Sequence, residues 1–236
     1  MYEAKRNIHK IKKDAQKVSI ILLAAGPGTR MKSLGVRSLI RLSNGESIID
    51  YQLRIINSIF NNNETIVVTG YESDKVMNKT PSNIIKIENE RYDSTNIARS
   101  ISIGLRACTT EYVFVIYGDL LFNDESLKIP LDSSSLLIDT HGLMKDSQIG
   151  CNIDNNQVEL LLYGLDNKWA QITYLTGKEL KLFKTVAWDR NNERKYGFEL
   201  INEVIDLGGK FIAIKNTHSK IFDVDSGKDL EKVKYL

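Results

Sequence analysis

The chain has 236 residues, of which 42% are hydrophobic and 26% charged, as is usual for a folded domain with a buried core. Its 32 basic and 30 acidic residues leave a formal charge of +2, which gives no argument for nucleic-acid binding. Cys108 and Cys151 are too few for a disulfide framework and lack the spacing of a metal site, so we expect reduced thiols in a cytoplasmic protein.

No membrane segment is expected. The longest apolar run, residues 18–25, has about half of the ~20 residues that a membrane-spanning helix needs. The glycine-containing loop after it does not resemble the cleavage site of a signal peptide. Residues 1–17 are basic, and we interpret them as a solvated N-terminal extension, either a short helix or a disordered arm, in preference to a nucleic-acid-binding arm.

The first half of the chain alternates between strand and helix patterns. Strands are predicted at residues 18–25, 65–69, 83–88 and 111–117, and helices at residues 47–60, 74–79 and 95–107. Ser94 or Thr95 is the expected N-cap of the helix at residues 95–107. This alternation predicts a parallel sheet of the doubly wound type.

The second half has a more antiparallel pattern. Strands are predicted at residues 134–139, 148–154, 157–163, 169–175 and 210–214, and helices at residues 177–183, 198–206 and 228–235. A hairpin turn is expected at residues 154–156. There are no internal repeats and no proline-rich linker, so residues 18–236 are predicted to form a single α/β domain. We expect a three-layer sandwich with a mostly parallel central sheet and a smaller, partly antiparallel portion.

The sequence LAAGPGTRM at residues 23–31 directly follows the first predicted strand. Glycines let the backbone approach a ligand closely, and successive N–H groups can bind phosphate oxygens. Arg30 adds a permanent cation with several donors. The loop lacks both the Gly-Lys-Ser/Thr of a Walker loop and the GxGxxG spacing of a dinucleotide site. The alternative, a plain strand-to-helix turn, does not account for Arg30.

This loop resembles the signature loop of the nucleotidyltransferases with a glycosyltransferase-A-like fold, a Rossmann-like fold of the nucleotide-diphospho-sugar transferase type. These enzymes activate sugar phosphates and alcohol phosphates with nucleoside triphosphates. The resemblance implies that the loop binds the nucleotide through Leu23, Ala24, Ala25, Gly26, Gly28, Thr29 and Arg30.

Two further segments resemble the phosphocholine cytidylyltransferase-like group of this family. YDSTNI at residues 92–97 is similar to its Tyr-x-x-Thr-Asn segment, which implies that Asn96 lies near the nucleotide. GDLLF at residues 118–122 is similar to its Gly-Asp segment, which implies that Gly118 contacts the nucleotide and that Asp119 binds Mg²⁺. The open alternatives are that Asn96 caps a helix and that Asp119 is a strand-end turn residue.

The segment at residues 221–230 resembles the closing pattern of the family, which supplies a second metal carboxylate. Asp223 and Asp225 alternate along an extended chain and therefore face the same side. Similarity to the (Glu/Asp)-x-Asp pattern favours Asp225, with Asp223 as the alternative. Asp229 is interpreted as structural, since an acid is favourable in the first turn of a helix.

One position departs from the family. Where its members have a lysine that contacts the α-phosphate, this chain has Arg37, whose planar guanidinium is not equivalent to an ammonium at a tight site. Because of this arginine, the site either works with altered geometry or binds nucleotide without turning it over. The resemblance as a whole covers residues 18–236 but is faint between residues 125 and 195.

The implied reaction is attack of a phosphate monoester on the α-phosphorus of a nucleoside triphosphate, with Mg²⁺ as cofactor and release of pyrophosphate. Arg30 and Arg37 are the expected catalytic cations. CTP is the favoured nucleotide, and the acceptor is a phosphocholine-like alcohol phosphate, a phosphonate or a sugar phosphate, used to build cell-surface polysaccharides. The alternatives are a sugar-1-phosphate nucleotidyltransferase with another nucleotide, a non-catalytic nucleotide-binding relative with a regulatory role, and a molybdopterin-type nucleotidyltransferase.

The acceptor pocket is the part that the sequence specifies least. Trp169, Trp188, Tyr196 and Glu199 are candidates for a site that binds a quaternary ammonium through cation–π and carboxylate contacts. The alternative, that these aromatic side chains belong to the core, is favoured by the usual burial of such residues. We expect a monomer or a homodimer that binds neither nucleic acid nor membrane.

Overall fold

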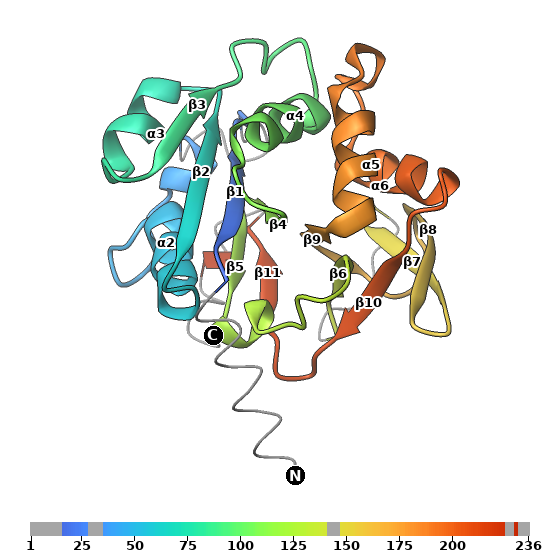
Figure 1. Cartoon of the computed structure of the whole chain (residues 1–236). Coiled ribbons are helices and arrows are strands. Elements are labelled where there is room, and N and C mark those ends of the chain that lie inside the picture. The colour runs from blue at the N-terminus through green and yellow to red at the C-terminus, as the bar shows by residue number, and fades with distance from the viewer. Residues whose placement is uncertain (1–15, 28–34, 141–146, 225–228, 231–236) are drawn as a thin grey trace.

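A computed structural model describes residues 16–27, 35–140, 147–224 and 229–230. Within these residues the main feature is a nine-stranded sheet in the order β3-β2-β1-β4-β9-β6-β10-β8-β7 (Figure 1). Its strands are β1 (Val18–Ala24), β2 (Asn63–Thr69), β3 (Ile85–Glu88), β4 (Tyr112–Tyr117), β6 (Ser135–Ile138), β7 (Ile149–Asp154), β8 (Gln157–Tyr163), β9 (Trp169–Thr176) and β10 (Phe211–Lys215). Strands β3, β2, β1 and β4 are parallel, as the alternating pattern predicts.

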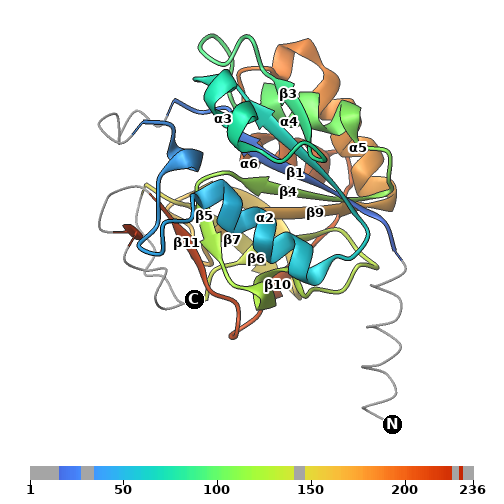
Figure 2. The ribbon, with the colours of Figure 1, turned by 90° about the vertical axis from the view of Figure 1, so that its left-hand side faces the viewer.

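Helices cover both faces of the sheet (Figures 1 and 2). They are α2 (Ile48–Ile59), α3 (Ser73–Lys79), α4 (Ile97–Ala107), α5 (Gly177–Trp188) and α6 (Gly197–Asp206). Apolar side chains of α2 and α3 pack in the core on one face, and those of α4, α5 and α6 pack in a second core on the other. Strand β1 is buried along its whole length because its side chains alternate between these two cores. The predicted three-layer α/β sandwich is confirmed.

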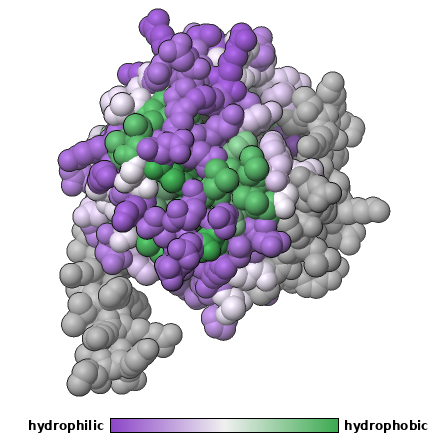
Figure 3. Space-filling model, turned by 90° about the vertical axis from the view of Figure 1, so that its right-hand side faces the viewer, coloured by the Kyte–Doolittle hydropathy of each residue, from purple (hydrophilic) through white to green (hydrophobic). Residues whose placement is uncertain are grey.

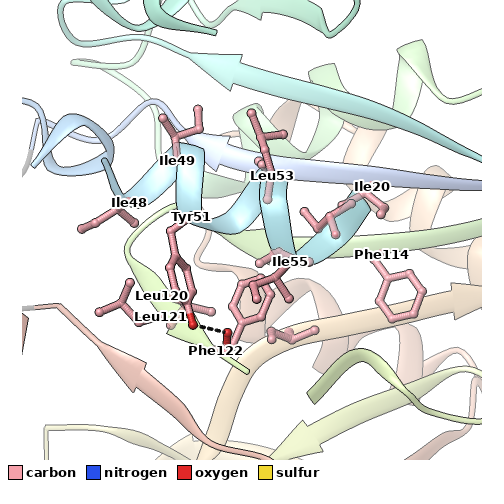
Figure 4. Packing of buried hydrophobic residues seen from close by; sticks show 14 of the residues in the cluster. Ile20, Ile48, Ile49, Tyr51, Leu53, Ile55, Phe114, Leu120, Leu121 and Phe122 are labelled. Atoms are coloured by element: carbon pink, nitrogen blue, oxygen red, sulfur yellow. Dashed lines mark hydrogen bonds between the residues drawn. The ribbon is translucent and has the colours of Figure 1, made fainter. Parts of the chain in front are cut away.

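Helix α2 packs against the backbone of residues 117–122, at the end of β4 (Figure 4). It begins after Ser47, whose hydroxyl accepts a hydrogen bond from the Asp50 N–H at 3.3 Å. The Tyr51 hydroxyl donates to the Phe122 carbonyl oxygen at 3.0 Å. The buried Gln52 amide donates to the carbonyl oxygens at positions 117 and 120, at 3.0 and 2.9 Å. The helix therefore holds the backbone on both sides of residues 118–119.

A second, two-stranded sheet lies next to this backbone. Strand β5 (Leu120–Phe122) pairs antiparallel with β11 (Ile221–Asp223), with Asp223 opposite Leu120. The sequence analysis does not predict either strand, because each has only three residues and the pairing joins distant parts of the chain. This pairing brings the C-terminal acidic segment beside the end of β4.

The second half of the sheet is mixed. Strand β8 runs antiparallel to β7, as the predicted hairpin at residues 154–156 requires, and also to β10. Strand β9 runs antiparallel to β4 and β6, whereas β10 and β6 are parallel. Helix α5 continues to Trp188, beyond its predicted end at residue 183. Most of the predicted helix at residues 228–235, and residues 1–15 of the basic extension, lie outside the described residues. The single-domain organisation stays a prediction.

The face of the molecule at the β7–β8 end of the sheet is mostly polar, with separate apolar patches (Figure 3). The largest exposed apolar side chains of β8 are Leu160, Leu162 and Tyr163, each between 42% and 49% exposed. No helix within the described part of the chain is long and apolar enough to span a membrane.

Candidate active site

The end of β1, where the loop begins, lies against Gly118, the residue after β4. The Gly118 N–H donates to the Leu23 carbonyl oxygen at 3.0 Å, and a Cβ atom at Gly118 would lie 2.6 Å from that oxygen. Only glycine permits this close approach. On the other side, the Tyr71 N–H donates to the Ala25 carbonyl oxygen at 3.1 Å, so the segment after β2 also holds the loop. Gly28, Thr29 and Arg30 lie outside the described residues.

A cleft follows this edge of the sheet. Its two adjoining parts share five residues, Leu23, Gly26, Pro27, Asn96 and Ile97. One part extends over the loop before α4 and is also lined by Ala25, Asn89, Tyr92, Thr95 and Ser100. The other extends toward β4 and is also lined by Ala24, Arg37, Ser38, Tyr117, Gly118, Asp119 and Tyr196. The structure thus gathers most of the described residues that the sequence assigns to nucleotide and metal. It places them at the carboxyl ends of parallel strands, where open α/β sheets bind ligands.

Asn96 is the N-cap of α4, so the expectation of Ser94 or Thr95 is wrong. The Asn96 side-chain oxygen accepts a hydrogen bond from the Ile97 N–H at 2.8 Å, whereas the Thr95 hydroxyl donates backwards to the Arg91 carbonyl oxygen. Because Asn96 also lines the cleft, capping and proximity to a nucleotide are compatible. The N-terminus of α4 therefore faces the cleft, and its partial positive charge favours an anion there.

A buried asparagine holds the loop before α4. Asn89 is 2% exposed, and its amide donates to the hydroxyls of Thr95 (3.3 Å) and Ser100 (3.2 Å). The Arg91 N–H donates to the side-chain oxygen of Asn89 at 3.2 Å. The sequence analysis does not single out Asn89, although a polar residue directly after a predicted strand was an available signal. The Asn89 contacts give the cleft a fixed wall.

Asp119 and Asp223 are neighbours in the fold, because Asp223 pairs opposite Leu120, the residue after Asp119. The Val224 N–H donates to the Asp119 carbonyl oxygen at 2.9 Å, which places the two acidic segments side by side. Arg37 forms an ion pair with Oδ2 of Asp119. Burial raises the pKa of Asp119 above its ordinary value; the Arg37 charge opposes this shift, and the Asp223 carboxylate adds to it. Burial and the Asp119 charge also raise the pKa of Tyr117, which keeps this phenol protonated.

A buried lysine holds the second carboxylate. Lys168 Nζ lies 3.0 Å from Oδ2 of Asp223 and 3.5 Å from Oδ2 of Asp139, and the Gln148 amide donates to the same Asp223 oxygen at 3.4 Å. The Lys168 side chain is only 9% exposed. Lys168 is not predictable from the local sequence, because its partners come from distant segments. The one local signal was a charge directly before an apolar strand.

The two carboxylates fit a divalent cation. Oδ1 of Asp119 and Oδ1 of Asp223 are buried and have no hydrogen-bond partner among the described residues. Such atoms require a partner, and carboxylate oxygens are the ligands that Mg²⁺ prefers. The described residues contain no group of three or more His, Cys, Asp or Glu side chains at metal-binding distances. Two carboxylates suffice for Mg²⁺ when substrate phosphates supply further ligands. Asp225 lies outside the described residues.

Of the four acceptor-site candidates, only Tyr196 lines the cleft. Its ring is half exposed and stacks on Phe198 with centroids 5.9 Å apart, and Tyr163 contacts the same phenylalanine edge-on at 5.5 Å. Glu199 serves a local purpose instead, because its carboxylate accepts the Tyr196 N–H at 2.6 Å at the start of α6.

The structure does not bring the two tryptophans to the cleft. Trp169 is 3% exposed within β9, and its ring packs behind Tyr117 with centroids 5.7 Å apart, so it belongs to the core. Trp188 lies at the end of α5, beneath the guanidinium of Arg106, 5.1 Å from the ring centroid. Arg106 is in the last turn of α4, at the opposite end from Asn96.

The chain is similar to a known protein family and to several solved structures. Residues 20–129 match the model of the MobA-like NTP transferase domain family. These residues are therefore similar to an NTP transferase domain. The match spans β1 to β5 and therefore includes the loop after β1, Asn96 and Asp119. The resemblance to nucleotidyltransferases is thus confirmed, and no curated protein sequence matches the chain.

Solved structures are similar in fold to nearly the whole chain. The CTP:phosphocholine cytidylyltransferase from Streptococcus pneumoniae has a TM-score of 0.72 and 16% identity, covering 93% of this chain and 99% of that one. The inositol-1-phosphate CTP transferase from T. maritima has a TM-score of 0.72 and 20% identity, covering 92% and 96%. A nucleoside-diphosphate-sugar pyrophosphorylase from Vibrio cholerae RC9 has a TM-score of 0.69 and 12% identity, covering 93% and 100%. At these identities the similarity establishes the fold.

Proposed function

We propose that this protein is a Mg²⁺-dependent nucleotidyltransferase that transfers a nucleotidyl group, CMP in preference, from a nucleoside triphosphate to a phosphorylated small molecule and releases pyrophosphate. The observation that carries the proposal is the convergence of Asp119 and Asp223 beside the cleft that the loop after β1 lines. Each carboxylate keeps one buried oxygen without a partner among the described residues. The match to an NTP transferase domain supports the reaction class.

The chain's own residues provide alignment and charge in this reaction. The N–H groups of the loop after β1, with Arg30, bind the triphosphate, and the N-terminus of α4 at Asn96 adds a favourable dipole. Arg37, which lines the cleft, contacts the α-phosphate. Asp119 and either Asp223 or Asp225 hold the metal, which supplies charge neutralisation on the phosphates. No protein nucleophile is needed, since the acceptor phosphate attacks the α-phosphorus directly.

The acceptor in this proposal is a phosphocholine-like alcohol phosphate, a phosphonate or a sugar phosphate. The two CTP-dependent structural neighbours carry names of alcohol-phosphate enzymes, and a third is named for sugar nucleotides. The half-exposed Tyr196, stacked on Phe198, provides an aromatic wall at the cleft for the acceptor's organic group. We further propose a cytoplasmic monomer or homodimer that supplies activated groups for cell-surface polysaccharides.

The test is pyrophosphate release by the full-length protein with Mg²⁺. The assay combines each of the four nucleoside triphosphates with phosphocholine, a phosphonate, inositol 1-phosphate and glucose 1-phosphate. We expect release with CTP and one class of acceptor, and none without acceptor or with EDTA. Absence of release in every combination, with nucleotide binding intact, would contradict the enzymatic proposal.

That outcome would favour a second candidate, a nucleotide-binding relative without catalysis. The specific observation behind it is the ion pair between Arg37 and Asp119. A guanidinium bound to a metal carboxylate reduces the negative charge available to the metal. The Arg37→Lys variant, which restores the ammonium that the family uses, would then gain turnover that the wild type lacks.

A further inference from the structure

The two carboxylates of the candidate metal site pair with basic side chains that differ in their access to the cleft. Lys168 is 9% exposed, contacts both Asp223 and Asp139, and does not line the cleft. Arg37 is 19% exposed, contacts Asp119, and lines the cleft together with it. The ammonium of Lys168 at Asp223 is therefore enclosed by the protein, whereas the guanidinium of Arg37 at Asp119 is accessible to a ligand in the cleft.

The segment that carries Arg37 is anchored independently of its guanidinium. Arg37–Leu39 form a 3₁₀ turn between Val36 and Ile40, which are 3% and 5% exposed in the core. The Ile40 N–H closes the turn on the Arg37 carbonyl oxygen at 3.1 Å. The guanidinium stands on a long side chain with several rotatable bonds, so it can change partners while the backbone stays in place.

The guanidinium and a divalent cation compete for the same carboxylate. With Arg37 on Oδ2, the charge of Asp119 is already neutralised, and a free metal ion must displace or tolerate a neighbouring positive charge. A triphosphate entering the cleft changes this balance. Phosphate oxygens are strong bidentate partners for a guanidinium, and they bring further negative charge for the metal.

We infer that Arg37 is an exchangeable counter-ion: it neutralises Asp119 in the ligand-free protein, and the phosphates of the nucleotide draw it away, so that metal and nucleotide bind cooperatively. The nucleotide half of this inference rests on the proposed function; the competition between Arg37 and metal does not. Coupling of this kind is reciprocal, so metal raises nucleotide affinity by the same factor as nucleotide raises metal affinity.

The test is a titration of the metal-stripped, full-length protein with Mn²⁺. The electron paramagnetic resonance signal of free Mn²⁺ measures how much of the ion is bound. The titration compares the wild type with Arg37→Gln and with the matched control Arg41→Gln. Arg41 is exposed on the same segment and donates to the Gly45 carbonyl oxygen. If Arg37 occupies Asp119 about nine-tenths of the time, Arg37→Gln binds Mn²⁺ about tenfold more tightly than the wild type. Arg41→Gln binds it like the wild type.

A second titration adds α,β-methylene-CTP, which the protein cannot cleave at the α-phosphorus. The analogue should tighten Mn²⁺ binding by a larger factor in the wild type than in Arg37→Gln, because only the wild type has a guanidinium to transfer. Thermal unfolding of each variant confirms that the fold is retained.

Three outcomes would count against the inference. Equal or weaker Mn²⁺ binding by ligand-free Arg37→Gln would overturn the competition. An equal effect of the analogue on both proteins would overturn the transfer of the guanidinium to the nucleotide. If neither CTP nor its analogue affects Mn²⁺ binding or is itself bound, the CTP preference of the proposed function fails, while the ligand-free comparison still tests the competition.

Discussion

The main-chain N–H of Val224 donates a hydrogen bond to the carbonyl oxygen of Asp119 at 2.9 Å. This bond joins the end of β11 to the turn after β4, and the antiparallel pairing of β11 with β5 continues the contact. Two acidic segments that are distant in the sequence thus share one short piece of backbone structure. The position of Asp223 relative to Asp119 is set by main-chain hydrogen bonds, which makes the pair a fixed feature of the fold.

The first prediction concerns Asp119. The Asp119→Asn variant should keep the fold, because the amide is nearly isosteric and Arg37 lies at the cleft surface, where water can solvate it. It should lose Mg²⁺-dependent pyrophosphate release by at least about a hundredfold, since the amide lacks the charge that holds the cation. Steady-state kinetics and thermal unfolding measure the two effects. Retention of most activity would make Asp119 a turn residue only.

The second prediction distinguishes the two C-terminal acids. Asp223 has a buried oxygen without a partner among the described residues, and it lies beside Asp119. Similarity to the family pattern favours Asp225 instead. The Asp223→Asn and Asp225→Asn variants should therefore be compared for Mn²⁺ affinity. The acid that binds the metal should show a loss of about tenfold or more, and the other should show less.

A third prediction concerns stability at the opposite end of the sheet. Glu64 accepts hydrogen bonds from Ser19 Oγ (2.8 Å), the Thr109 N–H (2.9 Å) and Thr109 Oγ1 (2.6 Å), and Lys17 lies 3.5 Å away. Burial alone would raise the pKa of Glu64, but the Thr109 and Ser19 hydrogen bonds and the Lys17 charge outweigh it and lower this pKa. The ionised form therefore stabilises the fold above the unfolded pKa, and this stability is lost as the pH falls through the lowered folded pKa.

Glu64→Gln should accordingly reduce the free energy of unfolding by about 1–2 kcal/mol at pH 7, and by less below pH 4. Urea unfolding at both pH values measures this difference. Glu72→Gln is the matched control, because Glu72 forms an exposed ion pair with Lys75 and should change little at either pH. The same loss at both pH values would show that the charge of Glu64 is not responsible.

The local parts of the site are predictable from sequence, and the long-range parts are not. The loop after β1 and the Gly118–Asp119 turn each combine a buried strand with a glycine within two residues of its end, so the pattern itself places them at the ligand edge of a parallel sheet. Lys168 carries no such pattern. Its role comes from contacts with Asp139 and Asp223, which only the assembled sheet brings within reach.

The acceptor candidates illustrate the same limit. Trp188 and Tyr196 are close in sequence, yet α5 extends to residue 188 and carries the tryptophan to the far end of α4, against Arg106. Tyr196 lies at the start of α6, next to the cleft. Proximity in sequence does not predict proximity in space across a helix end, since the following turn changes the direction of the chain.

The fourth prediction is nucleotide preference. CTP with Mg²⁺ should raise the unfolding midpoint more than UTP, GTP or ATP, because a ligand that binds only the folded state stabilises it by mass action. At a concentration 100 times the dissociation constant the gain is about 2.7 kcal/mol. Thermal-shift titrations measure the order of the four nucleotides. A larger shift with any other nucleotide would contradict the preference for CTP, which rests on the similarity of residues 92–97 to the cytidylyltransferase-like group.

The last prediction concerns turnover by Arg37 variants. If the protein is an active enzyme, Arg37→Ala should reduce kcat by about a hundredfold while the KM for nucleotide changes less. The reason is that a contact with the α-phosphate strengthens as charge redistributes in the transition state, whereas ground-state binding depends on the loop after β1. Arg37→Lys should retain or exceed wild-type turnover, because its compact ammonium keeps the positive charge and binds Asp119 without the planar, bidentate geometry of a guanidinium. Stopped-flow measurement of pyrophosphate release with saturating Mg²⁺ separates kcat from metal affinity. Equal turnover by the wild type, Arg37→Ala and Arg37→Lys would show that the ion pair with Asp119 has no part in the chemistry.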